Sequence, residues 1–355
     1  MPSSTIDTFL ACSIMIILAL SAMVGTSKLM APYLNDMSHR DDAERFQQLA
    51  SYILLNTGAP SNWGQMKDIA PTSLGLAKAD SSIPYELDID KVSRLKDGNI
   101  YSLTYADLWE ALGVKDVAFQ IEIKTLFELS IRLVSNLTLG NETAYEFEVA
   151  TRKSGMPIAT NLNGYLVVEN FVDKVASSTS SNGVGSMSAN VPNSVNGTAL
   201  LLVFARSEMN SQMVSFKAYT FSHSAPSPPP NGTFTRLSPL NHVLNVSLAY
   251  STTEILKAQV FSFGYNFSLT EKARETQTIE YFIPQLLDPS PMMIVLTGHN
   301  GSTSFAEWVS YPQLPLQTGV NFSESITGSK IVSLSHIITI NSALYEAVTK
   351  WGTTN

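Results

Sequence analysis

The longest apolar stretch of the chain stands at its N-terminus. Residues 8–27, between Asp7 and Lys28, carry no charged side chain. A helix of about 20 apolar residues spans the roughly 30 Å hydrocarbon core of a bilayer. This stretch therefore predicts a membrane-spanning helix. A cleaved secretory signal is the alternative, but the run exceeds the usual ~7–15 apolar residues of such signals, and no Lys or Arg precedes it.

The apolar pattern continues in a different form after this stretch. Hydrophobic residues recur at three- and four-residue spacing, at Phe46, Leu49, Ala50, Ile53 and Leu54. This period is typical of an amphipathic helix, and Pro32 would kink a helix without necessarily ending it. A stop signal follows at residues 57–60, Thr-Gly-Ala-Pro. We therefore expect one helix over about residues 5–56, with an apolar first half and an amphipathic second half.

The rest of the chain has mainly the pattern of β-strands. Residues 105–113 predict a short helix that ends at Gly113, and the C-terminus predicts another, capped by Asn341 or Ser342. Segments rich in Val, Ile, Phe, Tyr and Thr predict strands at 117–124, 128–138, 144–151, 164–172, 199–207, 212–222, 244–250, 258–269, 292–297 and 330–340. The expected fold class is α+β, a long N-terminal helix followed by a β-rich, sandwich-like head.

Composition divides the chain into four parts. Residues 1–57 form the expected helix, and residues 58–175 a mixed α/β region of the head. Residues 176–198 are rich in Ser, Asn and Gly, a composition that predicts a loop or linker. Residues 199–355 form a β-rich C-terminal region. The Ser/Asn/Gly-rich segment either separates two domains or is an insertion within one.

Charge and cysteine content narrow the function classes. Charged residues make up only 15% of the chain, and 30 Asp and Glu outnumber 22 Lys and Arg. Nucleic acid is not an expected partner, because phosphate binding requires clustered basic side chains. Cys12 is the only cysteine, so intrachain disulfides and multi-cysteine zinc sites are excluded.

The motifs of enzymes and cofactor sites are absent from the sequence. The five histidines do not occur at metal-ligand spacing, and no P-loop, Gly-x-Ser-x-Gly or dinucleotide fingerprint is present. Glu86, Asp88 and Asp90, with Asp97 nearby, raise the alternative of an irregular calcium site, although Val92 stands where an EF-hand needs an oxygen ligand. Asp97-Gly98-Asn99 has the pattern of a hairpin turn. We expect no catalytic residue, no cofactor and no metal.

Five short segments resemble a recurring arrangement in archaeal type IV pilin-like surface proteins. They are residues 58–64 (GAPSNWG), 74–77 (LGLA), 91–92 (KV), 112–114 (LGV) and 119–123 (FQIEI). Together with the N-terminal pattern, the resemblance covers about residues 1–125. It implies a surface subunit that self-assembles or joins other pilin-like subunits through its N-terminal helix.

The resemblance also assigns residues to the membrane and assembly helix. These residues are Asp7, Phe9, Leu10, Ile14, Ile17, Leu18, Leu20 and Pro32. If the mature chain began at Ser3, Asp7 would occupy the acidic fifth position at which some pilins pair with a neighbouring amino terminus. The alternative is that Asp7 is a helix-start acid favoured by the helix dipole. The basic residue that precedes the apolar segment of archaeal prepilins is missing.

Glycosylation signals bear on which side of a membrane the head lies. Asn-x-Ser/Thr occurs at Asn136, Asn141, Asn196, Asn231, Asn245, Asn266, Asn300 and Asn321. Lys28, Arg40 and Arg45 follow the apolar stretch, which by the positive-inside rule would place the head in the cytoplasm. Long domains, however, translocate largely regardless of charge. Because all eight signals lie after residue 135, we expect an extracellular head.

These patterns favour a structural protein of the cell surface. We expect a pilin-like subunit, anchored in membrane lipid or assembled in an extracellular filament, that displays a glycosylated β domain for adhesion or surface contact. The alternative is a monomeric, membrane-tethered extracellular binding module. A surface hydrolase would require a catalytic constellation that the sequence does not contain.

Overall fold

The computed structural model describes residues 42–224, 226–285, 290–322 and 331–353, together with residues 15, 23 and 28. The chain divides into two compact units, Met1–Ser51 and Tyr52–Asn355. Residues 42–55 are helical, which confirms the end of the amphipathic helix predicted before Thr57. No helix within the described ranges is both long enough and apolar enough to cross a membrane.

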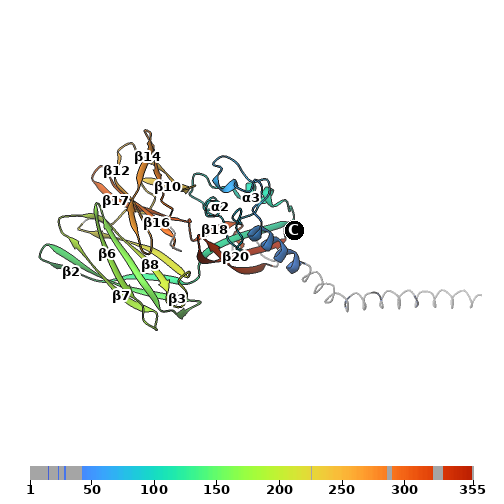
Figure 1. The fold of residues 1–355 in the computed structure, drawn as a ribbon, viewed down its shortest axis with the longest axis horizontal. Coiled ribbons are helices and arrows are strands. Elements are labelled where there is room, and N and C mark those ends of the chain that lie inside the picture. Colours follow the sequence, from blue (N-terminus) through green and yellow to red (C-terminus); the bar gives the residue numbers. More distant parts are fainter. Residues whose placement is uncertain are drawn as a thin grey trace, which may run out of the picture. The chain divides into compact units, whose positions relative to one another are not determined.

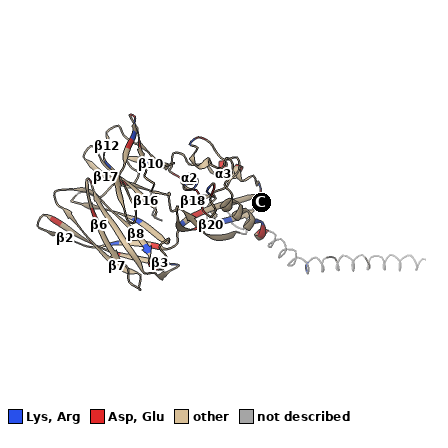
Figure 2. Cartoon of the chain, viewed as in Figure 1, with Lys and Arg blue, Asp and Glu red and all other residues tan. Residues whose placement is uncertain are grey.

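The expected α+β fold class is wrong. Of the described residues, 54% lie in strands and 11% in helices, and the helices are short. The long helix expected over residues 5–56 is not an element of this structure. Most of its residues lie outside the described ranges, and a continuous helical segment is described only over residues 42–55. Long-range strand pairing builds the second unit, which is drawn in Figure 1. Charged side chains are sparse along its strands (Figure 2).

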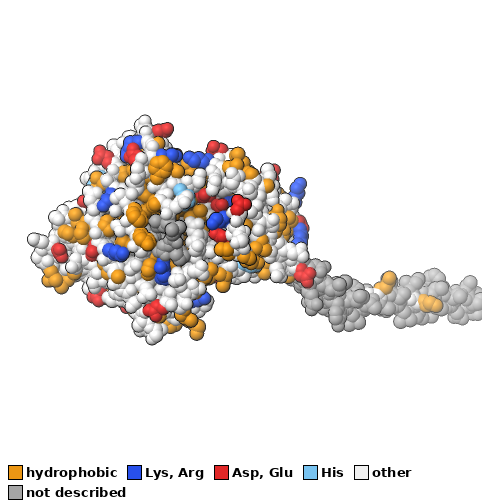
Figure 3. Space-filling model, in the orientation of Figure 1, with side chains coloured by type: hydrophobic (Ala, Val, Ile, Leu, Met, Phe, Trp, Pro, Cys, Tyr) orange, Lys and Arg blue, Asp and Glu red, His pale blue; other side chains and the backbone are white. Residues whose placement is uncertain are grey.

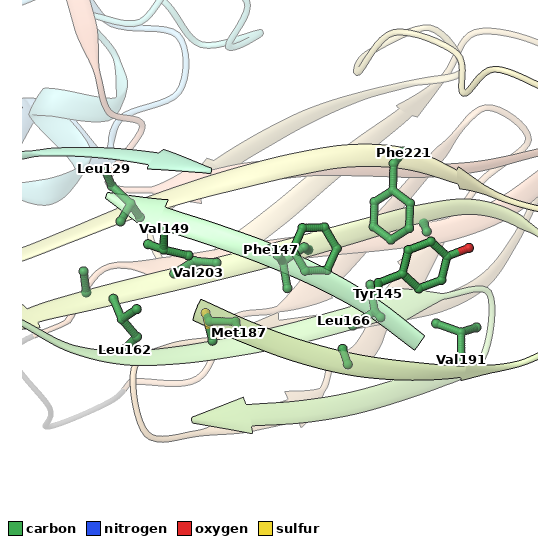
Figure 4. Packing of buried hydrophobic residues seen from close by; sticks show 14 of the residues in the cluster. Leu129, Tyr145, Phe147, Val149, Leu162, Leu166, Met187, Val191, Val203 and Phe221 are labelled. Carbon is green, nitrogen blue, oxygen red and sulfur yellow. The ribbon is translucent and has the colours of Figure 1, made fainter. Parts of the chain in front are cut away.

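Two sheets form a β-sandwich in the middle of the sequence. One contains β2 (Glu128–Leu139), β3 (Glu142–Lys153), β4 (Met156–Pro157) and β7 (Val184–Pro192). The other contains β6 (Phe171–Ser178), β5 (Thr160–Val168), β8 (Gly197–Ser207) and β9 (Val214–His223), in that order. Alternate side chains of both sheets meet in a core that includes Phe147, Met187 and Leu166 (Figure 4).

The second of these sheets is buried on both faces. In β8 the run Ala199–Ala205 is buried at every position, as expected for a strand covered on both sides. Leu200, Leu202 and Phe204 pack with Met293 and Val295 of a third sheet. That sheet has the order β13 (Asn266–Ser268), β12 (Thr253–Phe261), β16 (Met292–Asn300) and β17 (Thr303–Tyr311).

Two further sheets complete the second unit. One has the order β10 (Thr235–Leu240), β11 (Val243–Leu248), β15 (Thr278–Phe282) and β14 (Thr270–Arg274). The other has the order β18 (Leu316–Gly319), β1 (Val117–Thr125), β20 (Ala343–Thr353) and β19 (Val332–Ile340). The helical elements η1 (Trp63–Gln65), α2 (Ile89–Ser93) and α3 (Tyr105–Leu112) precede β1.

The helix predicted over residues 105–113 is confirmed as α3. Thr104 caps its first turn through a reciprocal capping box with Asp107, and Gly113 ends it in the left-handed conformation. Each of these capping interactions involves residues that are close together in the sequence.

Two other sequence predictions are wrong. The segment 176–198, expected to be a loop or linker, contains β7, which pairs with β3 along its whole length. Its small polar residues alternate with buried Met187, Ala189 and Val191, so it forms a half-buried strand. The C-terminal helix is instead β20: Asn341 and Ser342 have φ of 47° and 67°, which is the conformation of a tight hairpin turn and not of a helix cap.

Candidate functional site

Two clefts of the second unit meet at Trp308. The first has a volume of about 540 Å³ and is walled by residues 96–98, 231–237 and 308–315. The second has about 520 Å³ and is walled by the start of β2, by β9 and again by Trp308. Leu314 and Pro315 also line both clefts. Because the two clefts share these lining residues, we call them together the Trp308 groove.

The backbone of Trp308 is fixed by one side chain. The amide of Asn231 donates from Nδ2 to the Trp308 carbonyl at 2.9 Å and accepts the Trp308 N–H at its Oδ1 at 2.8 Å. Both backbone polar groups of Trp308 on β17 are thereby satisfied from the neighbouring loop. The indole packs at the margin of the cluster that contains Tyr165 and Phe204. The ring is therefore held in place beside both clefts.

Glu307, the residue before Trp308, also binds this loop to β17. Glu307 is buried, and its carboxylate accepts the backbone N–H groups of Phe234 and Thr235, each at 2.7 Å, and the Thr235 hydroxyl. Burial raises the pKa of Glu307, although these hydrogen bonds act in the opposite direction. With Asn231, it pins residues 231–235 against the strand that carries Trp308.

The opposite wall of the first cleft is also cross-linked. Buried Asn99 donates from Nδ2 to the Gln313 side chain at 2.6 Å and to the Pro239 carbonyl at 3.2 Å. Arg236 donates to the Gly98 carbonyl at 2.6 Å, and Lys96 to the Pro315 carbonyl at 2.8 Å. Three segments distant in sequence therefore form one preformed wall, as is usual for ligand pockets.

The second cleft combines an apolar floor with a charged rim. Leu129, Phe216 and Ala218 line it beside Trp308. The rim carries the cations Lys124, Arg152 and Lys217 and the anion Glu128. Such a groove can place an apolar or ring-shaped group against the indole and bind an anionic group by charge-assisted hydrogen bonds.

A second buried polar cluster lies just after residues 42–55. Lys91 is fully buried, and its Nζ donates to the carbonyls of Thr57 and Ala77 at 2.8 and 2.7 Å. Burial lowers its pKa, opposed by the nearby Asp88. Trp63 Nε1 donates to the Gly75 carbonyl at 3.0 Å, and a Cβ at Gly75 would lie less than 3.0 Å from backbone atoms of Asn56 and Gly58. We call this cluster the Lys91 hub.

The hub brings together residues from three of the five segments that carry the pilin-like resemblance, 58–64, 74–77 and 91–92. It also satisfies backbone groups where the helix ends, because the Ile53 carbonyl accepts from Leu76 N and the Asn56 carbonyl from Ala77 N. The last carbonyls of a helix need such partners, and a cation near them is favoured by the helix dipole.

The three carboxylates of the possible calcium site, Glu86, Asp88 and Asp90, each bind a different partner in the structure. Asp88 caps α2, Glu86 pairs with Lys78 at 2.8 Å, and Asp90 accepts from the Tyr311 hydroxyl at 2.6 Å and from Asn241 N at 2.7 Å. Residue 98 lies in a turn, as predicted, but no hairpin strands flank it. In the described ranges, no group of three or more His, Cys, Asp or Glu could hold a metal ion.

The eight glycosylation signals differ in their surroundings. Asn136, Asn141, Asn196 and Asn266 are exposed, whereas Asn245, Asn300 and Asn321 are half-buried. Asn300 accepts from the Thr252 hydroxyl at 2.6 Å and Asn245 from the Ser247 hydroxyl at 3.4 Å. Asn231 is exposed, but its amide is engaged on Trp308 as described above. The predicted sites therefore differ in exposure and in the hydrogen bonds of their side chains.

Sequence reasoning missed the Trp308 groove. The four tryptophans are scattered along the chain, and nothing near Trp308 in the sequence marks it as different. Asn231 lies 77 residues away from it, and Gln313 lies 214 residues from Asn99. The only local signal was the glycosylation motif at Asn231, which indicates an exposed loop.

The residues assigned to the membrane and assembly helix lie outside the described residues. They are Asp7, Phe9, Leu10, Ile14, Ile17, Leu18, Leu20 and Pro32.

No protein-family model matches the chain, and a search of curated proteins finds no significant match.

Proposed function

We propose that the chain is a cell-surface structural protein, held by its apolar N-terminal segment, whose β-rich second unit makes adhesive or surface contacts. The observation that carries this proposal is the Trp308 groove. It is a large, preformed surface on which apolar, aromatic and charged groups converge, the usual composition of a binding site. In the proposal, the groove contacts the ligand or neighbouring surface, and no chemical step is involved.

The Lys91 hub supports the structural part of the proposal. A head that makes contacts outside the cell must transmit load to its tether, and the hub joins residues 53–57 to residues 74–77 and 91–92 through hydrogen bonds. The residues that do so are those that resemble pilin-like proteins. The resemblance, the 20-residue uncharged segment and the exposed glycosylation signals favour a pilin-like subunit over a cytoplasmic protein.

The first experiment tests binding by the groove on cells that produce the full chain. We expect W308A to reduce adhesion of these cells to one another and to surfaces, with the amount of surface protein unchanged. W308L keeps apolar volume against the core and should lose adhesion equally if the aromatic ring is what binds. The matched control is F267A, which removes an exposed aromatic ring outside both clefts. Equal adhesion by all variants would contradict the proposal.

A second experiment addresses location and assembly. Protease added to intact cells should digest the head if it lies outside, and protection from protease would overturn the proposal. Electron microscopy of the same cells distinguishes the two forms of the hypothesis. Filaments labelled by an antibody to the head indicate a pilin-like subunit, whereas dispersed label on the membrane indicates a monomeric tethered binding module.

A further inference from the structure

The distal half of β2 is an unprotected sheet edge. Within the described residues β2 pairs only with β3, so the other edge of the strand carries unpaired backbone groups. Val134, Leu137 and Leu139 are 49%, 58% and 63% exposed. Hydrophobic side chains are visible at this end of the molecule, at the left of Figure 3. A long exposed edge with apolar side chains favours pairing with another chain.

The usual protective devices are nearly absent from this edge. From Leu133 to Asn141 the sequence LVSNLTLGN contains no charged residue and no proline. Proteins commonly protect edges with Lys, Pro, bulges or very short strands. Here one irregularity, between Leu133 and Ser135, interrupts the register with β3. The strand continues in regular pairing for five residues beyond it, from Ser135 to Leu139.

Three glycosylation signals gather at this same end of the sheet. Asn136 is in the middle of the exposed half of β2, and Asn141 is in the turn that follows it. Asn193 donates its backbone N–H to the Asn141 carbonyl at 2.8 Å and its side-chain amide to the Gly140 carbonyl at 3.2 Å. Asn196 follows Asn193 by three residues and is exposed. Three of the eight signals therefore lie at the same end of this sheet, with Asn136 on the edge strand itself.

The register defines which face a glycan on Asn136 would cover. Asn136 lies opposite Tyr145 and Thr138 opposite Thr143, so these side chains point to the inner face of the sheet. Leu137 and Leu139 lie opposite Ala144 and Glu142 on the outer face. A strand that paired with β2 would run only ~4.8 Å away. A bulky oligosaccharide on Asn136 would project from the inner face of β2 next to this free edge and would hinder the approach of such a strand.

We propose that N-linked oligosaccharide on Asn136, supported by oligosaccharide on Asn141 and Asn196, prevents the β2 edges of two copies from pairing. The inference rests on the proposed function, because it requires the head to be exposed to a glycosylating compartment. The oligosaccharides would then protect the β2 edge from pairing, as charged residues protect other sheet edges.

The test compares full-length protein from a glycosylating host, solubilised in detergent, as wild type and N136Q. Glycopeptide mass spectrometry should find oligosaccharide on Asn136 of the wild type. Sedimentation should show N136Q shifted to dimers or larger species at concentrations where the wild type does not associate. N136Q/L137K should return to the wild-type pattern, since a lysine on the edge disfavours pairing. The matched control N266Q removes a signal from β13, a strand of three residues, and should not associate.

A second measurement locates the contact. In a Cys12→Ser background, L137C should form an intermolecular disulfide only when N136Q is also present. Oligosaccharide on Asn136 with no association or cross-link in N136Q would overturn the inference and leave the surface proposal intact. An association that L137K does not reverse would also overturn it. Absence of oligosaccharide from every signal would overturn both the inference and the extracellular location.

Discussion

The side-chain amide of Asn231 pairs with both backbone polar groups of Trp308, as a neighbouring strand would. The backbone N–H and C=O of the residue that carries the indole are thus bound by a side chain from a loop and not by a strand. Glu307 anchors the same loop at Phe234 and Thr235. Two adjacent residues of β17 therefore fix the geometry of the groove.

This pairing predicts that N231D destabilises the protein. The carboxylate can still accept the Trp308 N–H, but it cannot donate to the Trp308 carbonyl and repels it. We expect a loss of about 1–2 kcal/mol in the free energy of unfolding, from one lost hydrogen bond and an unpaired acceptor. The measurement is denaturant unfolding of the full chain. N266D, the same change at an exposed signal without this pairing, is the control and should leave the free energy of unfolding unchanged.

The same pairing predicts unequal use of the glycosylation signals. Attachment of oligosaccharide at Nδ2 of Asn231 would replace an N–H of the amide that donates to Trp308 and would crowd the groove. We expect Asn136, Asn141, Asn196 and Asn266 to be modified in a glycosylating host and Asn231 to remain unmodified. Glycopeptide mass spectrometry measures the occupancy of each site. Full occupancy at Asn231 would show that the folded pairing does not control modification.

Lys91 should contribute strongly to stability although it has no ion-pair partner within hydrogen-bonding distance among the described residues. K91M preserves the length and apolar stem of the side chain but leaves the carbonyls of Thr57 and Ala77 without their donor. Buried unsatisfied carbonyls cost roughly 1–3 kcal/mol each, so the two carbonyls together predict a loss of about 2–6 kcal/mol in the free energy of unfolding. Thermal or denaturant unfolding tests this value.

The matched control for K91M is K153M, which changes an exposed lysine at the end of β3. It should unfold like the wild type. If K91M were as stable as the wild type, the carbonyls would have to be satisfied in another way, and the Lys91 hub would not be a structural element.

Asp90 predicts a dependence of stability on pH. Burial raises the pKa of Asp90 to about 6, a change opposed by the hydrogen bonds from Tyr311 and Asn241. An unfolded Asp has a pKa of about 3.9. Between these two values the folded protein retains a proton that the unfolded chain loses, so the free energy of unfolding falls as pH rises from about 4 to 6. At about 1.4 kcal/mol per pKa unit, the total change is on the order of 3 kcal/mol.

D90N removes this dependence while keeping an acceptor for Tyr311 and Asn241. We expect the variant to be more stable than the wild type at pH 8, with the difference disappearing below about pH 4. Unfolding curves of both proteins measured across this pH range provide the test. A variant that is less stable than the wild type at pH 8 would mean that the ionised carboxylate is net stabilising.

Local signals predicted part of the fold well. Gly113 was predicted to end α3, and the structure places it there because this signal depends only on residues within one turn. β3 could be recognised because its side-chain alternation reflects backbone geometry, and β16 because its run of apolar residues is typical of a buried strand. The same reasoning failed at Asn341-Ser342, where a helix cap and a hairpin turn use the same residue types. It also failed for β7, because composition outweighed a clear alternation of buried residues.

The sequence by itself determined the apolar segment at residues 8–27, the single cysteine, the scarcity of charge, the glycosylation signals and the positions of strands such as β1, β3 and β8. Each of these follows from composition or from a period of a few residues. Only the tertiary structure decided that β8 is covered on both faces, that β2 has a free edge, and that Asn231 meets Trp308. These features depend on which distant strands pair, and pairing is decided by the summed burial of whole sheets against the entropy of closing long loops. No short stretch of sequence contains that balance.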